Sequence, residues 1–231
     1  NTIKYEDFIN SDTARSAAYH YKSLLPSNYN ARILDIGYGN GWFMAACVRL
    51  GYTNIYGADF GGKKRMKGVV ESTNSLKEVY DITDNIWDFL SENGEKYDFI
   101  HFSHVIEHIP KYSLFHILDS IYNALSSNGV LLVRTPNMEG PLALSSLYIT
   151  LGHEYGFSAS NLQSLLSICK FNNIEFHDFP NFEPTIKVRI GDILRRAFIL
   201  LTKFKYRLFG ATGENFYNQF GIELIVSVRR S

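Results

Sequence analysis

A short apolar run leads directly into three closely spaced glycines. Residues 33–41 read Ile-Leu-Asp-Ile-Gly-Tyr-Gly-Asn-Gly, which places glycines at positions 37, 39 and 41. Glycine allows tight turns and close approach of the backbone to a ligand, because it has no Cβ. A helix is expected to begin just after these glycines, and its first turn offers free N–H groups and the positive end of its dipole. The segment therefore predicts a ligand-binding loop.

Two aspartates beside this loop have the chemistry of a nucleoside site. Asp59 ends the next expected strand, eighteen residues after Gly41, and its carboxylate can accept hydrogen bonds from both hydroxyls of a ribose. Asp35 stands two residues before the first glycine and suits a cationic ligand group better than a phosphate. The dinucleotide pattern Gly-x-Gly-x-x-Gly fits poorly, because Trp42 occupies the position of its third glycine.

The elements that must position these residues alternate between strands and helices. The hydrophobic pattern predicts strands at 32–36, 54–58, 76–80, 97–102, 130–133, 174–177 and 222–228. It predicts helices over 5–25, 42–50 and 63–75, a helix through 114–125 that ends at Asn128-Gly129, and one that begins with a Ser160/Gln163 capping box. Such alternation is typical of βαβ units and of a mostly parallel sheet. We expect a single domain over 1–231, with a helical segment 1–28, a core 29–180, an insertion 181–220 and a final strand 221–231.

Composition narrows the functional classes. The chain has 231 residues, 45% of them hydrophobic, and a formal net charge of zero, which argues against a nucleic-acid substrate. Cys47 and Cys169 are too few and too far apart for a disulfide framework or a zinc site, so we expect two buried free thiols. The chain opens without a signal-peptide pattern, and the apolar run 197–201 is too short to span a bilayer. We therefore expect a cytoplasmic protein.

Four segments together resemble the class I S-adenosylmethionine-dependent methyltransferases. Residues 34–41, LDIGYGNG, look like the first motif of that family, and Gly-Ala-Asp at 57–59 is similar to the second. Residues 97–110, YDFIHFSHVIEHIP, resemble the segment that follows, and 128–137 resemble the fifth-strand region. The resemblance covers roughly residues 30–180 in the family's order. It departs at Tyr38, where small residues are usual.

The resemblance implies an α/β fold of the Rossmann-like, doubly wound type, with a mostly parallel seven-stranded sheet and an antiparallel C-terminal strand. It also implies S-adenosylmethionine as the cofactor. The glycines would wrap its methionine part, Asp35 would lie near the ammonium, and Asp59 would hold the ribose. The full set of cofactor-binding residues that it implies is Asp35, Gly37, Gly39, Gly41, Asp59, Asp81, Ile82, Ser103 and His104. Of these, Asp81 and Ile82 would flank the adenine, and Ser103 and His104 would lie near the transferred methyl group.

Several residues on the side of the site where the methyl acceptor would bind have more than one possible role. His153 and Glu154 lie in a loop that often covers the acceptor in this family, and a neutral histidine can take the proton as a hydroxyl is methylated. His108 is a second catalytic candidate, with helix capping or packing as its structural alternative. Arg134 and Asn137 follow the strand at 130–133, where Arg134 could clamp a phosphate or carboxylate or form a surface ion pair.

The string His104-x-x-Glu107-His108 has the spacing of an inverted zinc-protease motif. That motif requires a helix with both histidines on one face, whereas this segment is expected to be a strand-to-helix turn. We therefore expect no metal.

The expected function is methyl transfer from S-adenosylmethionine to a small-molecule acceptor. The segment after the core resembles bacterial small-molecule methyltransferases, including those of surface-polysaccharide clusters, so our first expectation is O-methylation of a sugar or sugar-linked precursor. A quinone-like or other small metabolite is the second. A non-catalytic S-adenosylmethionine binder and a dinucleotide oxidoreductase stay open as other classes. The basic and aromatic stretch 187–209 has three readings: a lid helix over the acceptor, a peripheral contact with a membrane or lipid-linked acceptor, or a dimer contact.

Overall fold

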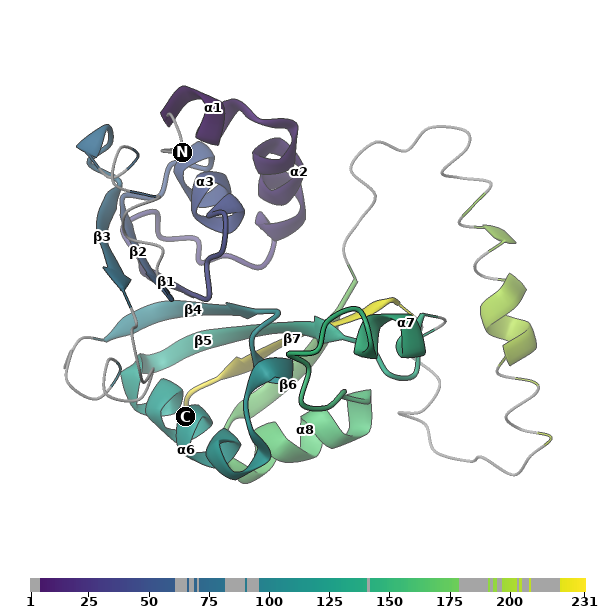
Figure 1. Cartoon of the computed structure of the whole chain (residues 1–231). Helices are drawn as coiled ribbons and strands as arrows, with labels where there is room; N and C mark the ends of the chain where they lie inside the picture. The colour runs from purple at the N-terminus through teal and green to yellow at the C-terminus, as the bar shows by residue number, and fades with distance from the viewer. Residues whose placement is uncertain are drawn as a thin grey trace.

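Seven strands form one mixed sheet in the computed structural model (Figure 1). Their order across the sheet is β3-β2-β1-β4-β5-β7-β6. Strands β1 to β5 pair in parallel, whereas β7 runs antiparallel to both of its neighbours. Their bounds are Arg32–Ile36 (β1), Asn54–Asp59 (β2), Leu76–Asp81 (β3), Tyr97–Ser103 (β4), Leu125–Pro136 (β5), Asn172–His177 (β6) and Glu223–Arg229 (β7). The expected mostly parallel seven-stranded sheet with an antiparallel C-terminal strand is confirmed.

The structure describes most of the chain outside the expected insertion. The described residues are 5–60, 66, 69, 71–81, 90, 96–140, 142–178, 191, 193–194, 197–202, 204, 208 and 221–231. The expected helix 63–75 and the insertion 181–220 therefore lie largely outside the described residues. Ile82 lies outside them too, and only the backbone of Asp81 is described.

Helices cover both faces of the sheet (Figure 1). One face carries α1 (Tyr5–Asn10), α2 (Asp12–Tyr21) and α3 (Trp42–Arg49), and the other carries α6 (Lys111–Ala124) and α8 (Ala159–Ile168). The 3-10 turn η1 (Ile106–His108) follows the carboxyl end of β4, and the short helix α7 (Ala143–Leu147) follows that of β5. These two short elements lie at the edge of the sheet where parallel α/β folds bind ligands.

Alternating side chains of β1 divide between two apolar layers. Leu34 and Ile36 belong to the core that includes α6 and α8, whereas Ile33 belongs to the core that includes α1, α2 and α3. Successive side chains of a strand point to opposite faces, so Asp35 points to the same side as Ile33. Asp35 pairs in register with His101 of β4. The sheet therefore places two polar side chains next to each other under α2 and α3.

The expected helix over 5–25 is two helices, because Ser11 interrupts it. Ser11 has an extended backbone, with φ −62° and ψ 151°, and its side chain accepts a hydrogen bond from the N–H of Ala14 at 3.1 Å. A serine hydroxyl in this position satisfies a free donor at the start of a helix, and so favours a new N-terminus over a continuous helix. The prediction of one continuous helix was wrong at this residue.

Two other helix boundaries differ from the expectation. Helix α6 ends at Ala124, four residues before Asn128, because the chain already joins β5 at Leu125. The capping box of α8 is made by Ser158 and Asn161, rather than by Ser160 and Gln163. The hydroxyl of Ser158 accepts the Asn161 N–H at 3.2 Å, and the Asn161 side chain accepts the Ser158 N–H at 2.9 Å. The sequence correctly predicted a capping box at the start of α8 but placed it two residues too late.

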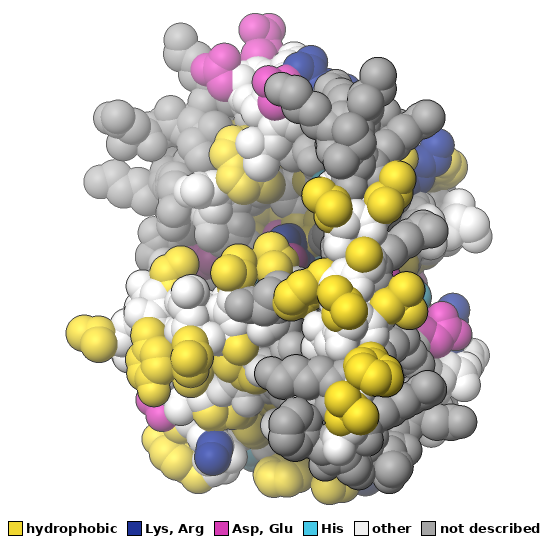
Figure 2. All heavy atoms as spheres, turned by 90° about the vertical axis from the view of Figure 1, so that its right-hand side faces the viewer, with side chains coloured by type: hydrophobic (Ala, Val, Ile, Leu, Met, Phe, Trp, Pro, Cys, Tyr) yellow, Lys and Arg dark blue, Asp and Glu magenta, His cyan; other side chains and the backbone are white. Residues whose placement is uncertain are grey.

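Hydrophobic side chains are exposed on the face shown in Figure 2. Two parts of the chain supply many of the exposed large hydrophobic residues: Leu142, Leu144, Tyr148, Ile149 and Leu151 in and around α7, and Ile193, Leu194, Phe198, Leu200, Leu201, Phe204 and Leu208. The basic residues of 187–209 lie outside the described residues, so the three readings of that stretch stay predictions. Among the described residues, no helix has both the length and the hydrophobicity of a membrane span. Cys47 and Cys169 are buried free thiols, as expected.

Replacement of Ser11 by alanine should lower the free energy of unfolding by about 1 kcal/mol, because it removes the cap of α2. The matched control is Ser167→Ala, at an exposed position inside α8, where the change should stay within about 0.5 kcal/mol. Urea denaturation followed by circular dichroism measures both. Equal stability of the Ser11→Ala variant and the wild type would contradict the assigned helix break.

Candidate functional site

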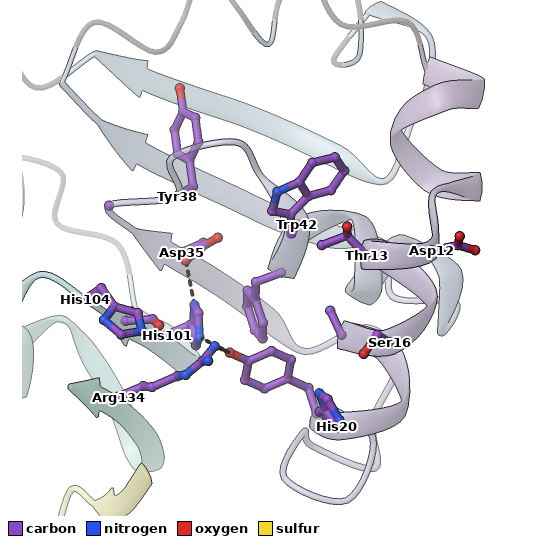
Figure 3. A pocket seen from close by; sticks show the side chains of 15 residues that line it. Asp12, Thr13, Ser16, His20, Asp35, Tyr38, Trp42, His101, His104 and Arg134 are labelled. Carbon is purple, nitrogen blue, oxygen red and sulfur yellow. Dashed lines mark hydrogen bonds and ion pairs between the residues drawn. The ribbon is translucent and has the colours of Figure 1, made fainter. Parts of the chain in front are cut away.

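A cavity of about 620 Å³ lies between α2, the start of α3 and the carboxyl ends of β1 and β4 (Figure 3). Its volume is in the range of small-molecule sites, and it opens at the sheet edge where parallel α/β folds bind ligands. Its lining comprises Asp12, Thr13, Ser16, Ala17, His20, Tyr21, Asp35, Gly37, Tyr38, Trp42, Phe43, His101, Ser103, His104 and Arg134.

The turn from β1 to α3 passes through three left-handed glycines. Gly37, Gly39 and Gly41 have φ values of 73°, 52° and 77°, a region that residues with a Cβ rarely adopt. A Cβ at Gly37 would clash with the side chain of Val105, whereas a Cβ at Gly39 would have no atom of the described residues within 4 Å. The turn is therefore packed tightly at its first glycine and open at its second.

Asp59 connects this turn to the end of β2. Its Oδ2 accepts a hydrogen bond from the N–H of Gly39 at 2.6 Å. Charge-assisted hydrogen bonds of this kind are short and strong, so they hold a loop in one conformation. The expected neighbours Gly39 and Asp59 thus meet directly, although twenty residues separate them in the chain.

A chain of hydrogen bonds runs along one wall of the cavity (Figure 3). Arg134 Nη1 donates to the Tyr21 hydroxyl at 3.4 Å, Tyr21 Oη lies 3.1 Å from His101 Nε2, and His101 Nδ1 lies 2.7 Å from Asp35 Oδ1. A carboxylate only accepts, so His101 donates its Nδ1–H to Asp35 and its Nε2 accepts from Tyr21. The direction of donation is then the same along the whole chain of hydrogen bonds, from the Arg134 guanidinium to the Asp35 carboxylate.

This hydrogen-bonded chain is buried, so its groups depend on one another. Asp35, His101 and Tyr21 are 2%, 4% and 4% exposed, and the ring of Phe43 stacks on His101 with 3.8 Å between centroids. Burial is the main reason that the pKa of Tyr21 is raised to about 12, so its hydroxyl keeps the proton that it donates. Because an unpartnered buried polar group is costly, loss of one member should disturb the others. Tyr21 belongs to α2, so this chain of bonds also fixes α2 to the sheet.

A second polar cluster surrounds His104 at the end of β4. Its Nδ1 lies 3.2 Å from Glu107 Oε1 and its Nε2 lies 3.0 Å from Glu223 Oε1. These two hydrogen bonds raise the pKa of His104 to about 9. Glu223 also pairs with Arg134 at 2.6 Å. Burial alone would raise the pKa of Glu223, but the hydrogen bond from His104 and the charge of Arg134 lower it. His104 is therefore a charged donor at neutral pH.

Four of the nine predicted cofactor-binding residues line the cavity. Asp35, Gly37, Ser103 and His104 line it, and Arg134, predicted on the acceptor side, lines it too. The adjoining turn holds Gly39 and Gly41. At the end of β3, the backbone of Asp81 pairs in register with Asp59, so the expected ribose and adenine residues are neighbours along the sheet edge.

The predicted acceptor-side residues divide between two places, and four of them lie apart from the described lining of the cavity. His108 and His153 face each other with ring centroids 4.7 Å apart, and the N–H of Glu154 donates to the backbone oxygen of Glu107 at 2.9 Å. Asn137 is 1% exposed, and its side-chain amide donates to the backbone oxygen of Gly221 at 2.9 Å. The roles predicted for these residues stay predictions.

Two residues that line the cavity, His101 and Tyr21, were missed by the sequence analysis. His101 carried a usable signal, because this histidine interrupts the apolar strand 97–102. Only the structure shows that it pairs in register with Asp35. Tyr21 carried none, since only the tertiary packing of α2 brings it to the sheet. The polar residues Asp12, Thr13 and Ser16 of the same helix reach the cavity for that reason too.

The chain matches a known protein family and known structures. Residues 10–175 match the family described as "Methyltransferase domain". Over 115 residues the chain is 33% identical to a "Ubiquinone biosynthesis O-methyltransferase" of Bartonella quintana; the match spans 50% of this chain and 44% of that relative.

Solved structures share the fold at low sequence identity. A SAM-dependent methyltransferase from Archaeoglobus fulgidus aligns with a TM-score of 0.64 and 16% identity, over 97% of both chains. The Burkholderia thailandensis 1,6-didemethyltoxoflavin-N1-methyltransferase aligns with a TM-score of 0.60 and 14% identity, over 98% of this chain and 84% of that one. At these identities the likeness concerns the fold alone.

Replacement of His104 by asparagine should remove a pH-dependent contribution to stability. Hydrogen bonds to Glu107 and Glu223 raise the folded-state pKa of His104 from 6.5 to about 9, against the opposing effects of burial and of the Arg134 charge. The contribution is therefore complete below about pH 6.5 and disappears as the pH rises through 9. Asparagine tolerates the left-handed backbone of this position, where φ is 53°.

Urea denaturation of the wild type and of His104→Asn between pH 6 and 9.5 measures this effect. The stability difference between the two proteins should shrink as the pH rises. The side chain of His104 is 42% exposed, so solvent attenuates the effect. A difference that stays constant over this pH range would refute the assigned charge.

Proposed function

The chain belongs to the methyltransferase-domain family, and from that membership we propose that it transfers a methyl group from S-adenosylmethionine to a small-molecule acceptor. One observation carries the proposal: the glycine turn after β1 is closed by the carboxylate at the end of β2, beside a cavity of about 620 Å³. This is the arrangement that a nucleoside needs at the carboxyl edge of a parallel sheet.

The described residues fit the functional groups of S-adenosylmethionine. Among the described residues, a Cβ at Gly39 would meet no atom within 4 Å, so these residues leave space beside a left-handed backbone. Asp59 uses Oδ2 for the Gly39 N–H, and a carboxylate has further lone pairs that can accept the hydroxyls of a ribose. Asp35 is a buried carboxylate at the cavity, where it can face the cationic methionine part.

We propose the following cofactor-binding residues: Asp35, Gly37, Gly39, Gly41, Asp59, Asp81, Ile82, Ser103 and His104. When bound, S-adenosylmethionine supplies a methyl group on a sulfonium, which is a good leaving group. The chain must therefore align the acceptor and exclude water. His101 and Tyr21 orient Asp35, and α2 covers one side of the cavity. His104 is a charged donor at neutral pH, so it orients polar groups and does not remove a proton there.

We propose a small metabolite as the acceptor. The O-methyltransferase of Bartonella quintana is named for ubiquinone biosynthesis, and the Burkholderia thailandensis structure is named for 1,6-didemethyltoxoflavin; both names support small-molecule acceptors. The sugar-linked acceptor expected from the sequence rests on resemblance alone, so it is the competing acceptor. Catalytic roles for His153 and His108, and acceptor contacts of Arg134, Asn137 and Glu154, are predictions that an acceptor panel can test.

Replacement of Asp59 by alanine should weaken binding of S-adenosylhomocysteine at least about tenfold, because one charged hydrogen bond contributes roughly 1.5–3 kcal/mol. Isothermal titration calorimetry measures the affinity of both proteins. Asp119→Ala is the matched control, since Asp119 is an exposed residue of α6 on the opposite face of the sheet and pairs with Lys170 at 3.7 Å. A folded wild type that gives no binding signal would overturn the proposed function.

Two glycine replacements separate ligand contact from backbone strain. Gly39 and Gly51 both have positive φ, 52° and 94°, and no atom of the described residues lies closer than 3.9 Å to a Cβ built at either glycine. Gly39→Ala and Gly51→Ala should therefore lose similar stability, about 1–2 kcal/mol. Only Gly39→Ala should lose affinity for S-adenosylhomocysteine, because its methyl group enters the proposed ligand space. Equal affinities of the two variants would exclude this placement of the ligand.

A further inference from the structure

Three side chains of types that can bind a metal ion lie close together outside the lining of the cavity. Glu107 and His108 belong to η1, and His153 belongs to the loop between α7 and α8. One possible ligand atom from each residue lies within 4.8 Å of the other two. We propose that these three residues form a binding site for a divalent transition-metal ion, with Zn²⁺ as the ion that suits them best. This inference departs from the sequence expectation of no metal, for which only the string His104-x-x-Glu107-His108 had been considered.

The backbone orients both histidines for this role. His108 Nδ1 lies 2.8 Å from the backbone oxygen of Gly152, and His153 Nδ1 lies 3.2 Å from that of Leu147. A carbonyl oxygen only accepts, so each Nδ1 carries its proton and each Nε2 keeps a lone pair. Metal-binding histidines almost always donate their second ring N–H to such an acceptor.

Glu107 is the anionic ligand, and its neighbours hold it in place. The residue is 1% exposed, its Oε1 contacts His104 Nδ1 at 3.2 Å, and its Oε2 accepts from Thr135 Oγ1 at 3.1 Å. Each carboxylate oxygen has a second lone pair, so both contacts can persist when a metal binds. A buried carboxylate fixed by hydrogen bonds pays little conformational entropy on coordination.

The Tyr155 hydroxyl, in the same loop as His153, provides a second observation. Its oxygen is buried and has no hydrogen-bond partner among the described residues. Buried hydroxyls normally have a partner. A water molecule bound to the metal would provide one.

Two imidazoles and one carboxylate define the kind of ion. Zn²⁺ binds this set with a water in the fourth position, whereas Mg²⁺ and Ca²⁺ prefer oxygen ligands. The ion would connect η1 to the loop that contains His153, which now contacts η1 through the Glu154 N–H and the Glu107 backbone oxygen at 2.9 Å. A bound ion would therefore link this loop to the segment that follows the carboxyl end of β4.

Metal binding by the full chain tests the proposal without any need for methyl transfer. After treatment with a chelator and its removal, Zn²⁺ is titrated in competition with a chromophoric chelator. We expect one Zn²⁺ per chain in the micromolar range or tighter, no competition from millimolar Mg²⁺, and a higher melting temperature with Zn²⁺.

His153→Ala and His108→Ala should each weaken Zn²⁺ binding by roughly 100-fold or more, since loss of even a second-layer partner costs 10–100-fold. His116→Ala, at an exposed position of α6, is the matched control and should bind as the wild type does. His108 is exposed, so His108→Ala should leave the fold intact. This variant therefore tests the site even if His153→Ala disturbs the fold. The proposal fails if the wild type binds no Zn²⁺, or if both ligand variants bind it as tightly as the control.

Discussion

The left-handed turn after β1 is the constraint on which the rest of the site depends. Gly37, Gly39 and Gly41 all have positive φ, and the turn that they form carries the chain from the sheet edge into α3, with Gly37 at the cavity. The Asp59 carboxylate fixes the turn through the Gly39 N–H. Since α3 supplies Phe43, which stacks on His101, the geometry of the turn also fixes the polar groups under the cavity.

The sheet could be predicted from the sequence because its signals are local. Apolar runs alternate with helical spacing, and each strand of the parallel core was expected within one or two residues, except β5. That strand begins five residues early, at Leu125, and ends three residues late, at Pro136. The errors at Ser11 and at Ser158 have one cause: several hydroxyl residues near a helix start compete for the same cap, and only the tertiary position of the helix decides between them. The glycine turn and Asp59 could also be predicted, because each is marked by residues close to the end of a strand in the sequence.

The remaining part of the site depends on contacts between residues far apart in the chain, which the spacing of residue types in the sequence does not predict. Tyr21 reaches His101 across eighty residues, and Glu223 reaches His104 across 119. Neither the strand order at the C-terminal edge nor the docking of α2 follows from hydrophobic periodicity. The same limit explains why His108 and His153 were predicted as separate acceptor residues, whereas their rings in fact lie 4.7 Å apart.

Helix α2 has a dual position, as a wall of the cavity and as a segment outside the sheet. Its attachment includes buried packing and the hydrogen bond of Tyr21 to His101. Segments of this kind open locally more easily than a central strand does. A ligand that contacts α2 binds only the attached form, so occupancy and attachment of the helix are thermodynamically linked. The amides of residues 12–21 should therefore exchange with deuterium more slowly when the cavity is filled, which makes this helix a natural reporter of occupancy.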